Sequence, residues 1–561
     1  MNLSLHMLTE LGLEGGLFMS KKLLMSTEEQ LHYPGPSINI QKIDGLSEGF
    51  IRGVDVSSII SLEQSGVKFY DVWGSKADVF KVLSQANVSH VRIRIWNNPY
   101  DVDGNGYGGG NCDLAKAIEL GKRATRYGLK TLIDFHYSDF WADPAKQKAP
   151  KEWKNYTVEQ RADAIYNFTK DSLNQLINAG VNVDMVQVGN ETGYGFCGCA
   201  TWDMGSDYTV VPFSDIAKLM NAGSRAIREI DSSILVVVHN TEPNSGYQWI
   251  SQDYYENNVD YDVFASSYYP NIHGSMANLQ TQLRYVADTY GKKVMVAETQ
   301  YPFTSENGDD YSNALSEKVG DMKYPLTIQG QARHVRDMCE LIHKIDDKGI
   351  GVFYWECAWI PVGSNWSENE PVWSKYGSGW ASKYAAGYDH EIEGDYSYGS
   401  AVDNQAFFDF NGYPLDSVNV FKYIYTGAKP SVPSGGDFTD CGHLGDLTQV
   451  TDWITANATY TMTDTTLTIK SNGNYSMFVH NSLPATEGTT LILEGYFVSG
   501  GSDSWASSQT IMYFRDCMTS DTHFYMELPA SVNDESTILQ IQVQGSSNVL
   551  TEMVLTKVYL Q

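Results

Sequence analysis

The chain of 561 residues has few cysteines, no long apolar run and a shortage of basic side chains. Its seven cysteines are scattered and show no metal-ligand spacing, which excludes a disulfide-rich scaffold. No stretch reaches about 18 apolar residues, so we expect no membrane span. The 39 basic residues stand against 68 acidic ones, and the formal charge of -29 argues against nucleic acid or an anionic membrane surface as the main partner. Neutral ligands are favoured.

A secretion signal is not recognisable either. Residues 1–45 contain no uninterrupted apolar segment after a basic start, and we interpret them as an unpatterned leader. The 42% hydrophobic and 19% charged residues are typical of a folded protein. With 36 Tyr and 13 Trp the chain is also rich in aromatic rings, which sugar-binding clefts use as flat apolar platforms, although most of them are expected in the core.

Short apolar segments alternate with longer amphipathic ones from residue 53 onward, which is the pattern of repeated β-α units. The predicted strands are Gly53–Ser58, His90–Trp96, Lys130–Tyr137, Val183–Glu191, Ile234–Asn240, Asp262–Tyr269, Lys293–Thr299 and Gly349–Glu356. Helices are predicted at Leu114–Tyr127, Val158–Ala179, Ser214–Ile230, Met276–Tyr290, Gln329–Ile345 and Leu415–Ile424. This α/β pattern predicts a (β/α)8 TIM barrel. A doubly wound open sheet competes, but polar residues end nearly every strand instead of clustering at one switch point.

The composition changes after the barrel. Residues 428–437 are rich in Pro, Gly and Ser, which indicates a linker after a barrel domain of residues 46–427. Residues 438–561 contain short alternating stretches with no helix between them, which predicts a C-terminal all-β sandwich. Such a module could bind carbohydrate, or it could be a spacer or surface-attachment domain.

Two predicted strands end in a glutamate. The apolar run from Val183 stops at Asn190 and Glu191, and the run from Lys293 stops at Glu298. The carboxyl ends of parallel barrel strands meet at one mouth, where active sites lie. Two carboxylates there can break a glycosidic bond, with one as proton donor and the other as nucleophile. The two glutamates therefore predict a retaining glycanase.

Most other strands also end in polar or aromatic groups. They are Asp55, Arg92, Arg94, Trp96, Asp134, His136, Asp139, His239, Tyr268, Tyr269, Trp355 and Glu356. An unsatisfied buried polar group costs about 1 to 3 kcal/mol. The presence of so many polar groups at one mouth therefore indicates that they have a function. Any one of them, taken alone, can equally be a hydrogen-bonded structural residue.

Several motifs resemble those of glycoside hydrolase family 53, the endo-β-1,4-galactanases, which belong to a clan of retaining (β/α)8 enzymes. The clearest are H-V-R-I-R-I-W-N-N-P-Y-D at 90–101, D-F-H-Y-S-D-F-W-A-D-P-A-K-Q at 134–147, V-Q-V-G-N-E-T at 186–192, V-M-V-A-E-T-Q-Y-P at 294–302 and F-Y-W-E-C-A-W-I-P-V-G at 353–363. The resemblance covers about residues 49–427. It implies that Glu191 is the acid/base and Glu298 the nucleophile, with their carboxyl groups about 5 Å apart.

The resemblance and the positions at the strand ends imply further roles around this pair. We expect Arg94 to keep Glu298 ionised, Asn190 to bind the sugar 2-hydroxyl, and Tyr268 or Tyr269 to orient the nucleophile. Trp355 is expected to form the floor of the central subsite. Contacts with flanking sugars are expected from His136, Asp139, Trp141 and His239. For Asp139 and Trp141, a capped loop with a packed ring is an equal alternative.

Some bacterial members of the family bind calcium between the loops after strands seven and eight. The corresponding oxygen donors here are Asp309, Asn313, Ser400 and Asp403. Tyr311 stands where a histidine is expected, so it could offer only its carbonyl oxygen. The alternative is an acidic loop without a metal.

The resemblance implies endo-hydrolysis of β-1,4-galactan, a side chain of pectin. A related glycanase for mannan, xylan or glucan remains an alternative, and so does a non-catalytic carbohydrate-binding barrel. Two apposed glutamates would serve no purpose in the last of these. Such a substrate implies an extracellular or cell-surface location, and we expect a monomer that needs no cofactor for its chemistry.

Overall fold

The computed structural model describes residues 36–428, apart from 393 and 395, and from residue 453 onward the strands β12 to β22 together with residues 504 and 517. The chain divides into two compact units, Met1–Ser431 and Val432–Gln561. Residues 1–35 of the expected leader and residues 429–437 of the expected linker lie outside the described residues. In the part of the chain that is described, no helix is both long and apolar enough to cross a bilayer.

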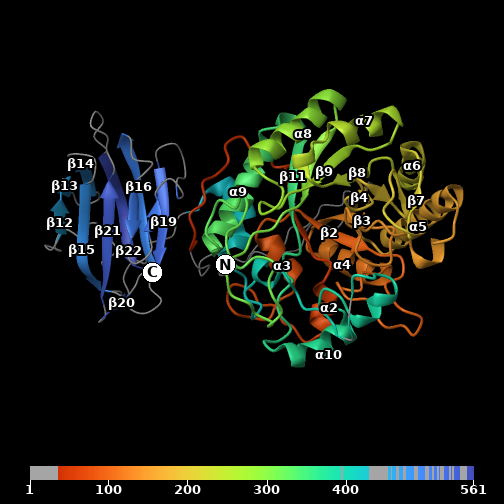
Figure 1. The fold of residues 1–561 in the computed structure, drawn as a ribbon, viewed down its shortest axis with the longest axis horizontal. Helices are drawn as coiled ribbons and strands as arrows, with labels where there is room; N and C mark the ends of the chain where they lie inside the picture. Colours follow the sequence, from red (N-terminus) through yellow and green to blue (C-terminus); the bar gives the residue numbers. More distant parts are fainter. Residues whose placement is uncertain are drawn as a thin grey trace, which may run out of the picture. The chain divides into compact units, whose positions relative to one another are not determined.

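Eight parallel strands close into a barrel in the first unit (Figure 1). Around the barrel they are β1 (Ile51–Asp55), β2 (His90–Ile95), β3 (Lys130–Phe135), β4 (Val183–Val188), β8 (Leu235–Asn240), β9 (Val263–Ser267), β10 (Lys293–Glu298) and β11 (Gly349–Tyr354). The predicted TIM barrel is therefore confirmed, and the open sheet is excluded because β11 pairs with β1. A small sheet of β5 (Gly195–Phe196), β6 (Cys199–Ala200) and β7 (Thr209–Val210) follows β4.

The barrel interior is filled by apolar side chains from every second strand position. Its cluster consists of Ile51, Leu132, Met185, Val237, Val263, Ala265, Met295, Ala297 and Phe353. A Cβ at Gly53 would lie 2.2 Å from the Phe353 ring, so the glycine makes room for that ring. The other faces of the strands pack against the helices, which explains why the strands read as nearly continuous apolar runs.

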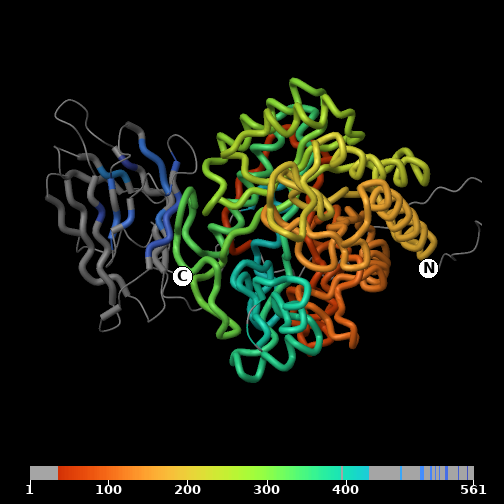
Figure 2. Tube along the Cα trace, turned by 45° about the vertical axis from the view of Figure 1, so that its right-hand side comes forward, coloured from red at the N-terminus to blue at the C-terminus, as the bar shows by residue number. Residues whose placement is uncertain are grey.

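Helices surround the barrel, and α5 and α6 stand at its periphery as long coils (Figure 2). The outer helices are α2 (Ile59–Gln64), α3 (Val79–Gln85), α4 (Leu114–Arg126), α5 (Val158–Asn178), α6 (Phe213–Ile230), α7 (Gln248–Glu256), α8 (Met276–Tyr290), α9 (Ile328–His343) and α11 (Val420–Thr426). A further helix, α10 (Trp366–Tyr376), belongs to the long loop after β11. The helix predicted at 415–424 is instead a 3₁₀ turn, Asp416–Asn419, followed by α11.

Part of the segment that we assigned to a leader belongs to the barrel domain. Ile38, Ile40 and Ile43 are buried. Ile40 exchanges both backbone hydrogen bonds with Ala428, at 2.9 and 2.8 Å. The domain thus begins before residue 46, because three isoleucines join its apolar core, while Asn39 and Ile43 donate hydrogen bonds to Gln329 of α9 and Ile424 of α11.

The second unit contains two antiparallel sheets, as expected for a sandwich. One sheet has the order β12-β15-β21-β17-β18 with β20 beside β21, and the other has the order β13-β14-β22-β16-β19. The strands are β12 (Trp453–Ala456), β13 (Ala458–Met462), β14 (Leu467–Ser471), β15 (Ser476–Pro484), β16 (Thr490–Ser499), β17 (Trp505–Ser507), β18 (Ile511–Tyr513), β19 (His523–Pro529), β20 (Val532–Asn533), β21 (Ser536–Val543) and β22 (Glu552–Leu560). Side chains from both sheets are buried, among them Ile469, Leu493, Met526 and Ile541.

Candidate active site

The end of β4 turns sharply and presents Glu191 at the mouth. Gly189 has φ 88° and Glu191 has φ 50°, so two of three residues adopt left-handed backbone. A Cβ at Gly189 would lie 2.5 Å from Thr192 Cγ2, so this turn needs glycine there. A glutamate in this conformation is uncommon and is held by its surroundings. Gln147 contributes by donating from Nε2 to the backbone oxygens of Asn190 and Glu191, at 2.8 and 3.3 Å.

The surroundings of Glu191 favour its protonated form. The side chain is 9% exposed, and Ser267 donates to its Oε1 at 2.5 Å. Burial, followed by the negative charge of Glu298, raises the pKa of Glu191 to about 8. A carboxyl group with this pKa carries a proton at neutral pH and can donate it.

Glu298, at the end of β10, lies among groups that stabilise a negative charge. Arg92 Nη1 is 2.8 Å from its Oε1, and Tyr269 donates to its Oε2 at 2.8 Å. Burial raises the pKa of Glu298, whereas Arg92 and the Tyr269 hydrogen bond act in the opposite direction. Because two neighbouring carboxyl groups resist ionising together, the one paired with arginine holds the charge. Glu298 is therefore suited to be the nucleophile.

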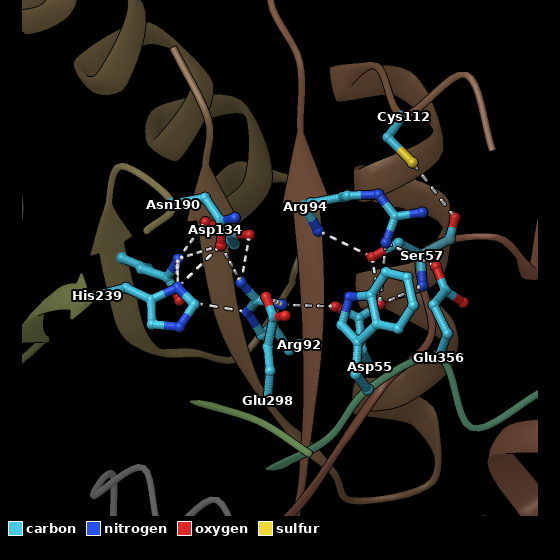
Figure 3. Close-up of polar contacts among 12 residues, drawn as sticks. Asp55, Ser57, Arg92, Arg94, Cys112, Asp134, Asn190, His239, Glu298 and Glu356 are labelled. Atoms are coloured by element: carbon cyan, nitrogen blue, oxygen red, sulfur yellow. Dashed lines mark hydrogen bonds and ion pairs between the residues drawn. The ribbon is translucent and has the colours of Figure 1, made fainter. Parts of the chain in front are cut away.

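We predicted Arg94 as the cation beside Glu298, and this was wrong. The cation is Arg92. Arg94 Nη1 instead lies 2.6 Å from Glu356 Oε1 and 3.6 Å from Asp55 Oδ1 (Figure 3). Both arginines point to the same side of β2 because they are two positions apart. Arg94 stands one step nearer the strand end, where Glu356 faces it. The sequence marked Arg92 as a strand-end residue, but nothing in it distinguished the two.

Arg92 is the centre of a buried polar network. Its guanidinium contacts Asp134 Oδ2 at 2.8 Å, Asp55 Oδ2 at 3.1 Å and Asn190 Oδ1 at 2.8 Å, in addition to Glu298. Figure 3 shows Arg92 between the group of Asp134, Asn190 and His239 on one side and Glu298 on the other. One positive charge thus links the ends of four strands, and it fixes the position of Glu298.

Three predicted sugar contacts are buried and have protein partners instead. His136 Nε2 lies 3.1 Å from Asp134 Oδ2, and its Nδ1 accepts from Trp96 Nε1 at 3.1 Å. Asp139 is fully buried and accepts hydrogen bonds from the backbone of Asn98 and Lys151. His239 is fully buried as well. All three are therefore held in place by protein partners, and their contact with a sugar remains a prediction.

His239 connects Asn190 to the residue that holds Glu191. Its Nδ1 is 2.8 Å from Asn190 Oδ1, and its Nε2 is 2.9 Å from Ser267 Oγ. Burial and the charge of Arg92 place the pKa of His239 well below its usual value, so the ring is neutral. Asn190 Nδ2 donates to Ala142 O at 2.8 Å and keeps one further hydrogen. The predicted hydrogen bond from Asn190 to a sugar hydroxyl remains a prediction.

Of the two tyrosines predicted to orient the nucleophile, Tyr269 and not Tyr268 contacts Glu298. Adjacent strand-end residues face opposite sides, so only one of the two can point into the mouth. Tyr268 is 1% exposed and donates to Gly274 O at 2.6 Å, within the packing between the barrel and its helices. The hydroxyl of Tyr269 instead reaches Glu298.

Four tryptophans pack together at one side of the mouth. Trp141 stacks on Trp380 with ring centroids 4.6 Å apart and on Trp359 at 6.2 Å, and Trp355 lies 6.1 Å from Trp141. Arg94 lies under this tryptophan cluster, with its guanidinium carbon 4.4 Å from the Trp141 ring centre. Trp359 and Trp380 were absent from our predicted site. The density of Trp in the loop after the eighth strand was a signal for both, and Trp359 also lies in the family motif at 353–363.

The two segments predicted to hold calcium come together. Backbone N–H groups of Ser400 and Gly308 donate to Asp309 Oδ2 and Asp403 Oδ2, both at 3.0 Å. Oδ1 of Asp403 and Oδ1 of Asn313 are buried without a hydrogen-bond partner. Burial raises the pKa of Asp309 to about 6, and burial with the charge of Asp309 raises that of Asp403 to about 7. Oxygen atoms that lack donors fit a hard cation.

The remaining predicted ligand, Tyr311, contributes no side-chain oxygen to this group. Its ring packs on Trp366 with centroids 5.0 Å apart, and its carbonyl oxygen accepts from Asn307 Nδ2 at 2.7 Å. Among the described residues, no group of three or more His, Cys, Asp and Glu side chains is arranged to hold a metal. A cation here would therefore depend on two carboxylates together with amide and carbonyl oxygens.

A closed (β/α)8 barrel whose mouth holds a buried glutamate with a raised pKa beside a second glutamate paired with arginine is the architecture of a glycoside hydrolase. The family model of Glycosyl hydrolase family 53 matches residues 51–421. An endo-beta-1,4-galactanase of Bacillus subtilis (strain 168) is 53% identical over 395 residues, which cover 70% of this chain and 90% of the relative. An arabinogalactan endo-beta-1,4-galactanase of Cellvibrio japonicus (strain Ueda107) is 33% identical over 345 residues, 59% of this chain and 85% of the relative.

The solved structure of the family 53 catalytic domain of Ignisphaera aggregans is similar as well. It is 34% identical, has a TM-score of 0.61, and the match covers 69% of this chain and 99% of that chain. The chain belongs to glycosyl hydrolase family 53, as its motifs indicated.

Proposed function

We propose that this protein is an endo-β-1,4-galactanase that hydrolyses (arabino)galactan with retention of anomeric configuration. The observation that carries the proposal is the pairing of Glu191, whose pKa is raised to about 8, with Glu298, which lies 2.8 Å from Arg92, at one barrel mouth. The substrate class rests on family membership and on relatives that are named endo-beta-1,4-galactanases.

The first chemical step uses the two glutamates in different roles. Glu298 attacks the anomeric carbon while Glu191 gives its proton to the oxygen of the departing sugar, so that a covalent galactosyl-enzyme forms. Arg92 and Tyr269 hold the attacking carboxylate in place. As the negative charge of Glu298 is consumed in the bond, the pKa of Glu191 falls, which suits its next task.

The second step reverses these roles. Glu191, now a carboxylate, removes a proton from water, and the water attacks the anomeric carbon and releases Glu298. Retention requires the two carboxyl groups about 5 Å apart, and this separation stays a prediction. NMR of the anomeric protons during early hydrolysis of galactan tests the mechanism. β-Galactose ends should form first, and α ends as first products would overturn it.

Substrate choice is tested by comparing polysaccharides. Purified enzyme should release galacto-oligosaccharides from β-1,4-galactan, with mixed chain lengths early in the digestion because cleavage is internal. Rates on mannan, xylan and β-glucan should be lower by about two orders of magnitude or more. An equal rate on any of these would assign the enzyme to another specificity of the same clan.

A calcium ion between the loops after β10 and β11 is part of this proposal. Asp309, Asp403 and Asn313 would hold it, with Ser400 and Tyr311 offering oxygen atoms nearby, and its effect would be to fix these loops. The support is the set of buried oxygen atoms without donors. EDTA should lower the melting temperature, and added Ca²⁺ should restore it. An unchanged melting curve in EDTA would refute the site. So would an Asp403→Asn variant whose melting temperature EDTA lowers as much as that of the wild type.

The location of the enzyme is proposed from the nature of its substrate. A polymer of plant cell walls is met outside the cell, so we place the protein outside or on the cell surface, as a monomer that degrades pectin side chains. Carbohydrate binding by the C-terminal sandwich would raise the local concentration of substrate. Pull-down on insoluble galactan, with and without residues 438–561, tests this role against that of a spacer.

A further inference from the structure

A stacked pair of aromatic rings lies beside Glu191 and has no part in the chemistry described above. Tyr194 follows Glu191 by three residues, and its ring stacks on that of Trp249 with centroids 5.8 Å and planes 22° apart. A Cβ at Gly193 would lie 3.8 Å from Cη2 of Trp249. The indole therefore reaches the backbone only two residues from the proton donor.

The position of Trp249 is fixed by a well-anchored helix. Ile250 and Tyr254 of α7 are buried, and the Tyr254 hydroxyl donates to Asn240 Oδ1 at 3.1 Å. Trp249 itself is 38% exposed. Tyr194 is held at its other end, since its hydroxyl donates to Glu242 Oε2 at 2.8 Å. The pair thus presents an exposed indole and a half-buried phenol ring, with a carboxylate at the edge of the phenol.

The pair lies on the opposite arc of the mouth from the tryptophan cluster. The glutamates at the ends of β4 and β10 divide the ring of strands into two arcs. Trp141 follows β3 and Trp355 follows β11, on the arc that contains β1 and β2. Trp249 and Glu242 follow β8, on the arc that contains β9. A sugar chain threaded between the two glutamates would therefore meet aromatic rings at both ends.

We propose that Trp249 and Tyr194 form a binding platform for the leaving-group side of the substrate, the part of the galactan chain that departs in the first step. This assignment rests on the proposed galactanase function. Glu191 protonates the oxygen of the departing sugar, and the pair adjoins Glu191. Trp355 lies on the Glu298 side, since its backbone N–H donates to the carbonyl oxygen of Thr299, the residue after Glu298, at 3.0 Å. The tryptophan cluster therefore holds the sugars that become covalently attached.

The chemistry of the platform suits a β-linked galactose. Sugar rings have an apolar face of C–H groups that packs on an aromatic ring, and hydroxyl groups at their edge that need acceptors. Glu242, on the rim of the pair, supplies such an acceptor. Helix α7 also carries a matched control: Tyr255 is 71% exposed and packs on Tyr290, with centroids 5.5 Å apart.

The test compares Trp249→Ala, Trp249→Phe and the control Tyr255→Ala. For each, kcat/KM is measured on galactan and on a nitrophenyl β-galactotrioside, whose leaving group contains no sugar. Trp249→Ala should lose about tenfold on galactan and at least five times less on the aryl substrate. Trp249→Phe should recover much of the loss, and Tyr255→Ala should behave like the wild type on both substrates. Melting temperatures verify that each variant is folded.

Two results would overturn the platform without touching the galactanase assignment. One is an equal loss on both substrates, and the other is a Trp249→Ala variant as active on galactan as Tyr255→Ala. A wild-type enzyme inactive on galactan would instead refute the proposed function. As an independent readout, added galactobiose should compete with water for the covalent intermediate in the wild type. Trp249→Ala should form at least fivefold less transfer product, because its acceptor site is impaired.

Discussion

Two buried arginine–glutamate pairs lie next to each other at the barrel mouth, and they differ in what surrounds them. Arg92 is 2.8 Å from Glu298, and Arg94 is 2.6 Å from Glu356. Both arginines come from β2, and the glutamates lie at the ends of two adjacent strands (Figure 3). Glu298 is 6% exposed, whereas Glu356 is only 1% exposed.

The role of each pair depends on the other residues that contact its glutamate and its arginine. Glu298 receives a hydrogen bond from Tyr269 and interacts electrostatically with Glu191, so it is oriented and paired with an acid. Glu356 accepts from Ser58 at 2.6 Å, and its arginine lies under the Trp141 ring. A buried ion pair at a strand end is thus no sign of catalysis in itself. Glu298 differs in its greater exposure at the mouth and in its neighbour Glu191, a carboxyl group with a raised pKa.

The largest expected effect comes from removing the nucleophile. Glu298→Gln should lower kcat on galactan by about 10⁴-fold or more, because no covalent intermediate can form. Glu356→Gln should lower kcat by less than about tenfold, since that carboxylate does not meet the sugar. Steady-state kinetics on galactan checks both variants. Comparable losses in the two would mean that Glu356 takes part in the reaction.

Removing the proton donor should have a smaller effect that depends on the substrate. Glu191→Ala should lower kcat/KM on galactan by about 10² to 10⁴-fold. Nitrophenyl galactosides should lose far less in the glycosylation step, because nitrophenolate departs without a proton. The comparison uses kcat/KM for both substrates. An equal loss on both would count against the acid role.

The Arg94 pair should matter for stability more than for chemistry. Arg94→Met leaves Glu356 buried without its cation and should lower the free energy of unfolding by about 3 kcal/mol. The exposed pair of Lys218 and Glu159 is a control, and Lys218→Met should cost at most about 1 kcal/mol. Urea unfolding followed by tryptophan fluorescence measures both. A change in Arg94→Met no larger than the control would show that the pair adds no stability.

The raised pKa of Glu191 should also appear in the pH dependence of stability. Its pKa is about 8 in the folded protein, above the usual value near 4.5. The folded state therefore binds the proton more tightly, and this contribution to stability is full below about pH 4.5 and is lost as pH rises through 8. The Glu191→Gln variant cannot ionise at this position. The difference between its melting temperature and that of the wild type should therefore shift in favour of the variant as the pH rises from 5 to 9. Parallel curves would show that the pKa is not raised.

The smallest expected effect distinguishes two adjacent tyrosines. Tyr269→Phe removes the hydrogen bond to Glu298 and should lower kcat by about tenfold, since a hydrogen bond to a charged group is worth about 1.5 to 3 kcal/mol. Tyr268→Phe should stay within about twofold of the wild type, because its hydroxyl bonds only Gly274. The same kinetic assay on galactan measures both, and a larger loss in Tyr268→Phe would reverse the assignment.

Strand periodicity and the polar strand ends were enough to predict the barrel, and with the family motifs they predicted the two glutamates. Glu191 and Glu298 could be found because each ends an apolar run, and a barrel brings all such ends to one mouth. The choice between Arg92 and Arg94 could not be made in this way. Both have the same residue type and face, and their partners are decided by how far each reaches along the strand. Burial of His136, Asp139 and His239 was likewise invisible, because depth below the mouth has no local signal.

The sequence by itself predicted the eight strands, the closed barrel and the two glutamates at strand ends, because these follow from patterns of two and 3.6 residues and from residue types at strand ends, which are local properties. Its motifs indicated the family and, through the resemblance, the roles proposed for the two glutamates. Only the tertiary structure decided which arginine forms the ion pair with Glu298 and which tyrosine donates a hydrogen bond to it. It also decided that Ile38, Ile40 and Ile43 belong to the barrel domain. The stacking of Trp249 on Tyr194 is of the same kind. Each of these depends on distances between residues far apart in the chain, and such distances are set by packing of the whole barrel.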